Sequence, residues 1–381
     1  MNKAIVIGFD AVNALGLVQS LGREGVYVIA VLECEKSELI KHSKYAKEIY
    51  SVNNVEEAIE LLIHKFANES SPIPVFAAGD GVAMALDKNY DKLSKYFLFE
   101  HAYGKYSIEQ LMDKELQVSV AKEFQFSVPV SVCIHAPFSV PQPMIYPCIV
   151  KPLVSCIGNK HDIVIAEDEK QLHDILTHKT FNTEDLLIQQ YIQRDYEYCM
   201  IGCSQKNGGV SMPLALRPVA FSHFLQDAST VQYVEPLSDE IFPEVVKIKE
   251  LMNAIKYVGL FSVEFMHDMK NGKIYFTEIN FRNDGTNSFI TQNGTNLPYL
   301  HYLDLLNLPP KTYSIIQKPK KVIWEGIHFS ALIHHDISLK KWLTELKGTE
   351  GFLYYFKDDK APFYFSFINK IKRIPILSSK R

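Results

Sequence analysis

The first 79 residues alternate between short apolar runs and amphipathic stretches, and this alternation constrains the fold more than any other feature. The apolar runs are 3–8, 26–32 and 74–79, and the stretches with helical spacing are 12–24 and 55–66. Runs that are apolar throughout are typical of parallel strands buried on both faces. The alternation predicts a doubly wound α/β domain. A ligand is expected beyond the carboxyl ends of its strands, near Gly8–Asp10 and Gly79–Asp80. The alternative is that Gly8 and Asp10 only form a tight turn and a helix cap.

Length and composition exclude several classes of protein. The 381 residues fit two or three domains, and 47% of them are hydrophobic, so a disordered chain is excluded. The net charge of −4 provides no general attraction to nucleic acid. No apolar run reaches the roughly 18 residues that a membrane span needs. The six cysteines include no CxxC pair and read as reduced thiols, so we expect a cytoplasmic protein.

The middle of the chain changes to a pattern that is rich in β-strands. Strands are expected at 146–152, 162–166, 186–192, 197–204, 209–221, 260–268 and 273–280. Helices are expected within 107–126, at 168–177 and at 243–256. The last two strands are joined by the short turn Met269–Gly272, so they should be antiparallel neighbours.

Acidic side chains interrupt this last strand pair. Glu278 and Asn280 are two residues apart and point to one face of their strand, and Glu264 on the paired strand can face the same way. Charge within mostly apolar strands is costly unless it has a use. Carboxylate and amide oxygens suit Mg²⁺, which also binds substrate phosphates. Arg282 follows with the same parity, so a polyphosphate between the metal and the arginine would be well placed.

Two further segments are suited to a nucleotide. Lys151 lies in the apolar run CIVKP, where an ammonium group facing the interior needs an anion such as phosphate. The loop that follows contains Ser155, Gly158 and Lys160, and Lys114 in the LMDK helix offers another cation. The strand ending in Gln189–Ile192 can present backbone groups to an adenine edge, and Glu197 can accept hydrogen bonds from a ribose.

In this order, the segments resemble the ATP-grasp superfamily. The resemblance covers about residues 1–310 and includes the DK helix, the YPxIVKP strand, the loop after it, a hinge strand with a later Glu, and the E…ExNxR pattern. Within the superfamily, the chain resembles the D-aspartate ligase-like carboxylate–amine ligases. NLPYLHYLDLLN (296–307) and YYFKDDKAPF (354–363) are also similar to that subgroup.

The resemblance implies a role for each matching residue. Lys114, Lys151 and Lys160 would bind the phosphates of ATP. Gln189, Gln190, Tyr191 and Ile192 would form the adenine hinge, with Glu197 on the ribose. Glu264, Glu278 and Asn280 would hold two Mg²⁺ ions, for which Mn²⁺ could substitute. Arg282 and Arg217 would be the catalytic cations. No base is identified for the amine, and Asp284 and Glu235 are the candidates.

The resemblance also implies a division of the chain and a reaction. A pre-ATP-grasp α/β domain would span 1–105, and an ATP-grasp domain of two α+β subdomains 106–310, with a lid at about 145–192. The implied reaction joins a small-molecule carboxylate to an amine through an acyl phosphate, in cell-envelope or peptide synthesis. Homodimers are common in the superfamily, and neither a nucleic acid partner nor a transmembrane segment is expected.

Three other functions stay open. The first is an ATP-grasp phosphotransferase or carboxylase, which a phosphorylated product in place of an amide would identify. The second is a nucleotide-binding protein without turnover, although the metal ligands and Arg282 are all present. The third, a dinucleotide-dependent oxidoreductase, rests on the N-terminal domain alone and leaves the second half of the chain unexplained.

The C-terminal extension, 311–381, differs from the rest in charge. It holds 14 Lys or Arg and 6 Asp or Glu, a net charge of +8, so the first 310 residues carry −12. We expect a solvated, basic subdomain. The alternative is a face for an anionic partner, such as a membrane surface or a nucleotide-linked precursor.

Overall fold

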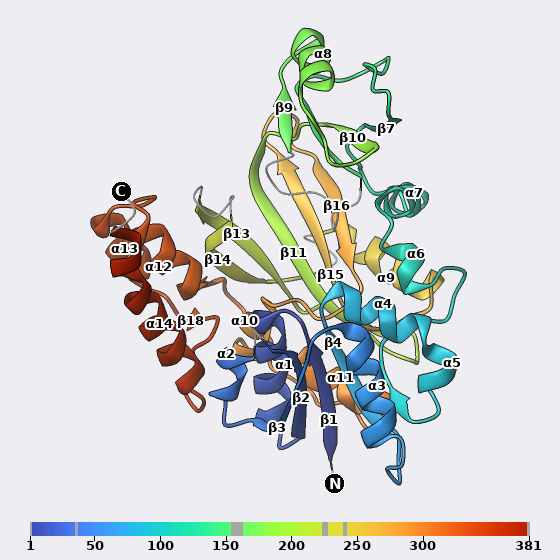
Figure 1. Cartoon of the computed structure of the whole chain (residues 1–381), viewed down its shortest axis with the longest axis vertical. Helices are drawn as coiled ribbons and strands as arrows, with labels where there is room; N and C mark the ends of the chain where they lie inside the picture. Colours follow the sequence, from blue (N-terminus) through green and yellow to red (C-terminus); the bar gives the residue numbers. More distant parts are fainter. Residues whose placement is uncertain (1, 35–36, 154–162, 223–227, 239–241, 379–381) are drawn as a thin grey trace. The chain divides into compact units, whose positions relative to one another are not determined.

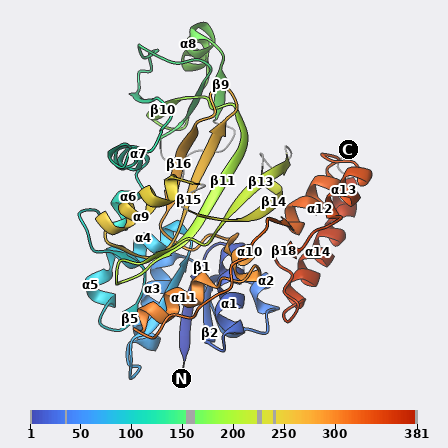
Figure 2. The same ribbon diagram turned by 180° about the vertical axis from the view of Figure 1, so that it is seen from behind.

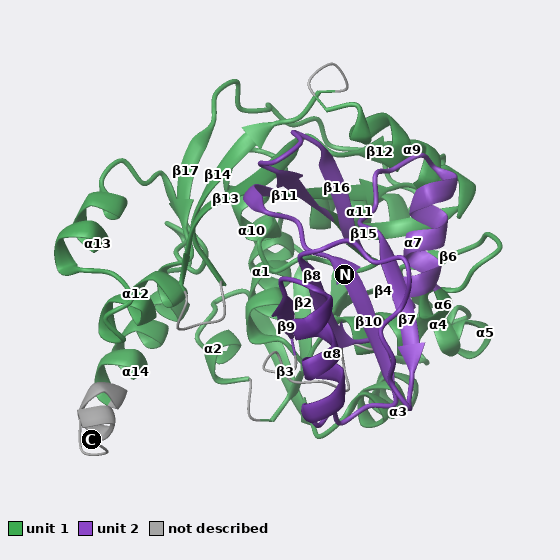
Figure 3. Cartoon of the chain, turned by 90° about the horizontal axis from the view of Figure 1, so that it is seen from above, with its two compact units in different colours: residues 1–110, 198–263, 279–381 green, residues 111–197, 264–278 purple. Residues whose placement is uncertain are grey.

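The computed structural model describes residues 2–34, 37–153, 163–222, 228–238 and 242–378, except the side chains of 373–378. The chain forms two compact units, coloured green and purple in Figure 3. Unit 1 consists of 1–110, 198–263 and 279–381, and unit 2 consists of 111–197 and 264–278. The chain therefore passes from one unit to the other four times. The domain boundaries expected near 105 and 310 stay a prediction.

The N-terminal part of unit 1 is a parallel sheet with strand order β3-β2-β1-β4-β5. Its strands are β1 (Lys3–Gly8), β2 (Tyr27–Glu33), β3 (Ala46–Val52), β4 (Ile73–Ala78) and β5 (Phe97–Leu98). Its helices are α1 (Ala11–Arg23), α2 (Glu38–Lys41), α3 (Val55–Phe66), α4 (Asp80–Lys88) and α5 (Tyr90–Leu93). β1 and β4 are buried almost throughout, as their apolar runs predict. The doubly wound α/β fold is confirmed.

The turn after β1 has a structural explanation. A Cβ on Gly8 would lie 2.5 Å from the Cβ of Ala14, so glycine lets α1 pack closely on β1. Asp10 is the N-cap of α1 and accepts hydrogen bonds from the N–H groups of Val12 and Asn13. Gly8 and Asp10 therefore form the predicted tight turn and helix cap, and a ligand contact at this turn stays a prediction.

A larger sheet has the strand order β16-β15-β11-β13-β14-β17-β18, with β12 on β11 and β6 on β15. Its strands are β6 (His101–Ala102), β11 (Arg194–Ser204), β12 (Val210–Ser211), β13 (Leu214–Ser222), β14 (Ala228–Pro236), β15 (Tyr257–Asp268), β16 (Ile274–Asn280), β17 (Lys320–Ile323) and β18 (Gly351–Phe352). β15 and β16 are neighbours, as predicted. Together with β11, they run from one unit into the other.

The remaining helices of unit 1 lie in the second half of the chain (Figures 1 and 2). They are α9 (Glu244–Ala254), α10 (Asn287–Gln292), α11 (Leu297–Leu305), α12 (Glu325–Ile333), α13 (Leu339–Leu346) and α14 (Ala361–Ser378). α1 contacts both α10 and α11, and buried side chains of all three belong to one hydrophobic cluster. Segments nearly 300 residues apart in sequence thus share a core.

Unit 2 contains an antiparallel sheet of order β7-β10-β8-β9. Its elements are β7 (Ser131–His135), β8 (Cys148–Pro152), β9 (Val164–Ala166), β10 (Asp185–Gln190), α7 (Lys114–Glu123) and α8 (Glu169–His178), and α6 (Ile108–Leu111) precedes them. Leu172 and Leu176 of α8 pack on apolar side chains of the sheet. Phe126, after α7, packs against Phe265 and Phe276 of the strand pair.

None of the helices in the described part of the chain is both long enough and apolar enough to cross a membrane.

Glu100, buried in unit 1, should make stability depend on pH. Its side chain is 1% exposed, one oxygen accepts from the N–H of Ala77, and burial raises its pKa to about 7. The folded state therefore favours the neutral acid, and the charged form becomes costly as pH rises from about 4.5 to 7. Each pKa unit corresponds to about 1.4 kcal/mol, so ionisation of Glu100 should lower the free energy of unfolding by a few kcal/mol. Glu100→Gln has no charge to bury and should not show this loss.

Urea unfolding of Glu100→Gln and the parent chain at pH 5 and pH 8 measures this effect. Other titrating groups are common to both chains and cancel in the difference. The variant should gain stability relative to the parent chain as pH rises. An equal difference at the two pH values would contradict the prediction.

Candidate functional site

Two lysines and a carboxylate of unit 2 come together from three separate elements. Lys114 is the first residue of α7, whose N-cap, Asp113, accepts from the N–H of Leu116. The Nζ atom of Lys114 lies 3.9 Å from an oxygen of Glu278 in β16. Lys151 in β8 donates to Oε1 of Gln189 in the neighbouring strand β10, at 3.0 Å. The predicted site residues of unit 2 thus form two contacting pairs, Lys114 with Glu278 and Lys151 with Gln189.

The Lys151 ammonium is in an unfavourable environment. Burial, and to a smaller extent the positive charge of Lys114, lower its pKa to about 8 against the opposing effect of the Glu278 carboxylate. Two ammonium groups that repel each other in a partly desolvated place are stabilised by an added anion. This arrangement is suited to binding a phosphate group.

The predicted adenine hinge follows β10. The N–H of Gln190 donates to the carbonyl of Val130, and the N–H of Tyr191 donates to the carbonyl of Pro147. Among the described residues, no hydrogen bond from the N–H of Ile192 is present outside the regular strands. Ile192 is therefore the position in the hinge that retains a backbone donor for a base.

Glu197, predicted to contact a ribose, forms an ion pair with Arg194 in the same strand. A ribose hydroxyl would have to share the carboxylate with this guanidinium. Lys160, predicted to close over the phosphates, lies outside the described residues together with Ser155 and Gly158.

Arg282 of unit 1 is held between two carboxylates. Its Nε donates to Asp80 at 2.9 Å, and its Nη1 lies 3.5 Å from an oxygen of Asp284. The side chain is 15% exposed. Asp80 is the first residue of α4, at the carboxyl end of β4, where the sequence pattern places ligand-binding residues. Asp80 and Asp284 thus fix the direction in which the guanidinium points.

Replacing Asp80 should change turnover more than stability. Asp80→Asn removes a charged partner of Arg282 but leaves Asp284, so we expect turnover to fall by about tenfold through loss of positioning. The Asp80 side chain is 47% exposed, so the pair contributes at most about 1 kcal/mol to folding. Steady-state kinetics and thermal unfolding measure the two effects. A large loss of stability with unchanged turnover would contradict this role.

A serine that the sequence argument passed over links Asn280 to Asp284. The Asn280 amide donates to the hydroxyl of Ser262 at 3.4 Å, and that hydroxyl donates to Asp284 at 3.2 Å. Because the amide nitrogen faces Ser262, the Asn280 carbonyl oxygen is left to act as a ligand. Ser262 is two residues before Glu264 in β15, so the strand parity used for the carboxylates could have identified it.

Arg217 and Glu235 form an ion pair across β13 and β14 in unit 1. Nε and Nη2 of Arg217 lie 2.8 and 2.7 Å from one oxygen of Glu235. This hydrogen bond raises the pKa of Arg217, and the guanidinium also lies over the Tyr233 ring at 5.4 Å. The structure thus brings together two candidates that the sequence treated separately.

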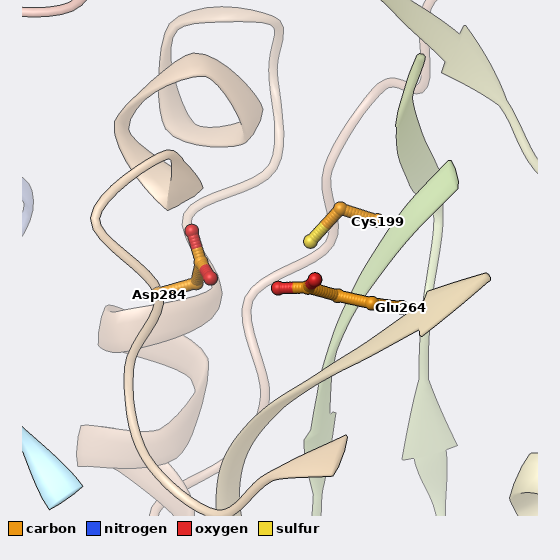
Figure 4. A group of neighbouring side chains, drawn as sticks. All are labelled: Cys199, Glu264 and Asp284. Atoms are coloured by element: carbon orange, nitrogen blue, oxygen red, sulfur yellow. The ribbon is translucent and has the colours of Figure 1, made fainter. Parts of the chain in front are cut away.

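Figure 4 shows the side chains of Cys199, Glu264 and Asp284, which point toward one another. One ligand atom of each lies within 4.8 Å of the others. Val263 of β15 is the last residue of the unit 1 segment 198–263, and Glu264 directly follows it in the same strand. The oxygens of Glu264, Glu278 and Asn280 suit a hard cation such as Mg²⁺, whereas the Cys199 thiol does not.

Asn283, directly after Arg282, belongs to a buried row of amides that also escaped the sequence argument. It donates to Asn13 of α1 at 2.6 Å and accepts from Asn287 of α10 at 2.8 Å. The row connects the segment after β16 to the N-terminal α/β sheet through α1. Since Asn13 and Asn283 are 270 residues apart, no local pattern could have revealed the contact.

Residues 119–297 match the family model of the ATP-grasp domain. D-aspartate ligase of Enterococcus faecium is 24% identical over 297 residues, which are 72% of this chain and 69% of that protein.

Solved structures agree in fold. N5-carboxyaminoimidazole synthetase from Staphylococcus aureus has a TM-score of 0.69 and 15% identity, and the match covers 94% of this chain and 91% of that one. L-amino acid ligase from Bacillus licheniformis has a TM-score of 0.59 and 16% identity, with 80% and 74% covered. Residues 119–297 of the chain therefore carry an ATP-grasp domain, and the solved structures share its fold.

Proposed function

We propose that the chain is an ATP-dependent carboxylate–amine ligase that acts through an acyl phosphate and uses an amino acid or a peptide as a substrate. The observation that carries this proposal is the convergence of Lys114, Lys151 and Glu278 in unit 2. Two neighbouring ammonium groups and a carboxylate are what the phosphates of a Mg·ATP complex require. The names of D-aspartate ligase and L-amino acid ligase support an amino acid as the substrate class.

Unit 2 would bind the nucleotide. Lys114 and Lys151 would contact the phosphates, and Lys160 would be a third cation. Within the hinge Gln189–Ile192, the N–H of Ile192 would donate to the adenine ring. Glu197 would accept from a ribose hydroxyl while it stays paired with Arg194.

Glu264, Glu278 and Asn280 would hold two Mg²⁺ ions, and Mn²⁺ could replace them because it takes the same oxygen ligands. When bound, the ions neutralise charge on the phosphates and orient them. Two carboxylates and one amide are a donor set that leaves coordination positions for water and phosphate oxygens.

The reaction would begin with two anions, so cations must screen them. A carboxylate oxygen of the first substrate attacks the γ-phosphorus, the bond to the β,γ-bridging oxygen breaks, and ADP leaves. Arg282 would stabilise the charge on the transferring phosphoryl group. The amine then attacks the acyl carbon, the bond to phosphate breaks, and an amide forms with loss of a proton. Arg217, held by Glu235, would orient a substrate carboxylate.

A screen for ADP release tests the reaction. Amino acids are supplied singly and in pairs with Mg²⁺ and ATP, and the products are identified by mass spectrometry. Release that depends on a pair, with an amide of the summed mass minus water, is the expected result. Release with one substrate and a stable phosphorylated product would identify a phosphotransferase instead. Nucleotide binding with no release under any condition would identify a binding protein without turnover.

The cytoplasm is the compartment proposed for this reaction because ATP is available there. The absence of a CxxC pair among the six cysteines is typical of thiols that stay reduced in such a compartment. A homodimer is the proposed assembly, and sedimentation of the full chain measures it.

A further inference from the structure

α14 exposes an apolar stripe along one face. Tyr364, Phe367, Ile368 and Ile371 follow the i, i+3, i+4, i+7 spacing of one helix face, and each is between 37% and 52% exposed. The apolar stripe of a surface helix normally faces the core of its protein. Here Tyr364, Ile368 and Ile371 face solvent, and Phe367, which also contacts α12, is partly exposed at the edge of the stripe.

The opposite side of α14 fixes the helix to unit 1. Phe365 stacks on His42 of the loop after α2, with ring centroids 4.0 Å apart. The Lys370 ammonium donates to the carbonyl of Gly326 and to the hydroxyl of Ser330, both in α12. Phe363 packs against the main hydrophobic cluster. The exposure of the stripe is therefore imposed by packing on the other side.

α13 adds two exposed leucines in the same part of unit 1. Leu339 and Leu343 are 59% and 55% exposed, and no residue of α13 is buried. Trp342 of α13 and Phe367 of α14 both contact Phe329 of α12. The two helices therefore flank α12, and Figure 2 shows them together at the C-terminal end of the chain.

Charge gathers in the same segment. Residues 360–381 contain six Lys or Arg and no Asp or Glu, so the net charge of −4 for the whole chain leaves −10 for the rest. The Lys360 and Lys372 side chains are exposed. A helix with aromatic and aliphatic side chains on one face and only cations among its charges is typical of a segment that lies in the interface of an anionic membrane.

We propose that α13 and α14 dock on a bilayer surface that contains anionic phospholipid. The apolar stripe of α14 would enter the boundary between head groups and acyl chains, and Lys360 and Lys372 would lie against the phosphates. A convex helix face suits a deformable lipid surface, whereas a protein partner would need a groove of matching shape. This attachment is independent of the ligase reaction and would bring the enzyme to membrane-bound substrates.

Vesicle co-sedimentation of the full chain tests the proposal. The chain should bind vesicles of phosphatidylcholine with phosphatidylglycerol and release them as salt rises, and it should bind pure phosphatidylcholine only weakly. Ile368→Ser with Ile371→Ser should weaken binding by more than about tenfold. Lys360→Gln with Lys372→Gln should reduce the preference for the anionic lipid.

The matched control is Val246→Ser, which removes an exposed apolar side chain of α9 and should bind like the parent chain. Circular dichroism and ADP release from soluble substrates verify that each variant is folded. Equal binding to both vesicle types, or binding unchanged by the isoleucine variant, would overturn the proposal. So would a dimer that the isoleucine variant converts to a monomer, because a second copy would then cover the stripe.

Discussion

Glu278→Gln should reduce ATP turnover by about a thousandfold or more, because it removes the charge of a proposed metal ligand without changing the shape of the side chain. The fold should survive. Glu278 is 34% exposed, and its contact with Lys114 spans 3.9 Å, so the pair contributes at most about 1 kcal/mol to stability. A coupled assay of ADP release and a thermal unfolding curve measure the two properties.

The control for this variant lies on the same strand. Thr277 neighbours Glu278 in β16, points to the other face and is exposed. Thr277→Ala should keep the turnover of the parent chain. Undiminished turnover in Glu278→Gln would remove the metal assignment, whereas equal losses in both variants would indicate damage to the strand.

Lys151→Met should lower turnover by about two to three orders of magnitude, because a charge aimed at the transferring phosphates is lost.

The parent chain should also take up protons when ATP binds. With a pKa of about 8 in the nucleotide-free chain, Lys151 is half-charged at pH 8, and an anion beside it restores the ammonium form. Calorimetry in two buffers of different ionisation enthalpy should find uptake of about half a proton at pH 8 and little at pH 6.5.

Substitutions of two charged neighbours test, without ATP, in which direction each one shifts the pKa of Lys151. Lys114 lowers the pKa of Lys151 and Glu278 raises it. In the nucleotide-free chain, Lys114→Gln should therefore move the midpoint for acetylation of Lys151 by acetic anhydride to higher pH, and Glu278→Gln should move it lower. Mass spectrometry reads the labelling at this residue. Shifts in the same direction, or none, would contradict the electrostatic account.

Much of the fold follows from local patterns. Helix α3 spans Val55–Phe66, as its apolar spacing predicts, and the predicted strand pair is β15 with β16. β3 was missed because AKEIYSV carries two charged side chains and is only half-buried. α4 was missed because it begins Asp80–Gly81, a pattern typical of a turn. Local propensity is overridden by packing in both elements.

The candidate site likewise contains residues that local patterns predict and residue pairs that they do not. Glu278 and Asn280 were predicted because alternate residues of a strand share one face. Lys151 was predicted because it is the one charged residue in an apolar run. The contact of Arg282 with Asp80 spans 202 positions, and that of Arg217 with Glu235 depends on the register of two strands. Such pairs exist only in the folded chain. The roles of these residues in binding ATP, metal and substrate stay predictions.

The four crossings between the units affect how this enzyme can be divided or recombined. Unit 2 is assembled from two stretches of chain, 111–197 and 264–278, and three strands belong partly to each unit. No continuous gene fragment encodes either unit. A truncation that isolates one of them would sever strands of the larger sheet, and exchange of a unit between homologues would require several simultaneous joints. We therefore expect such enzymes to diversify by point substitution and loop change rather than by shuffling of modules.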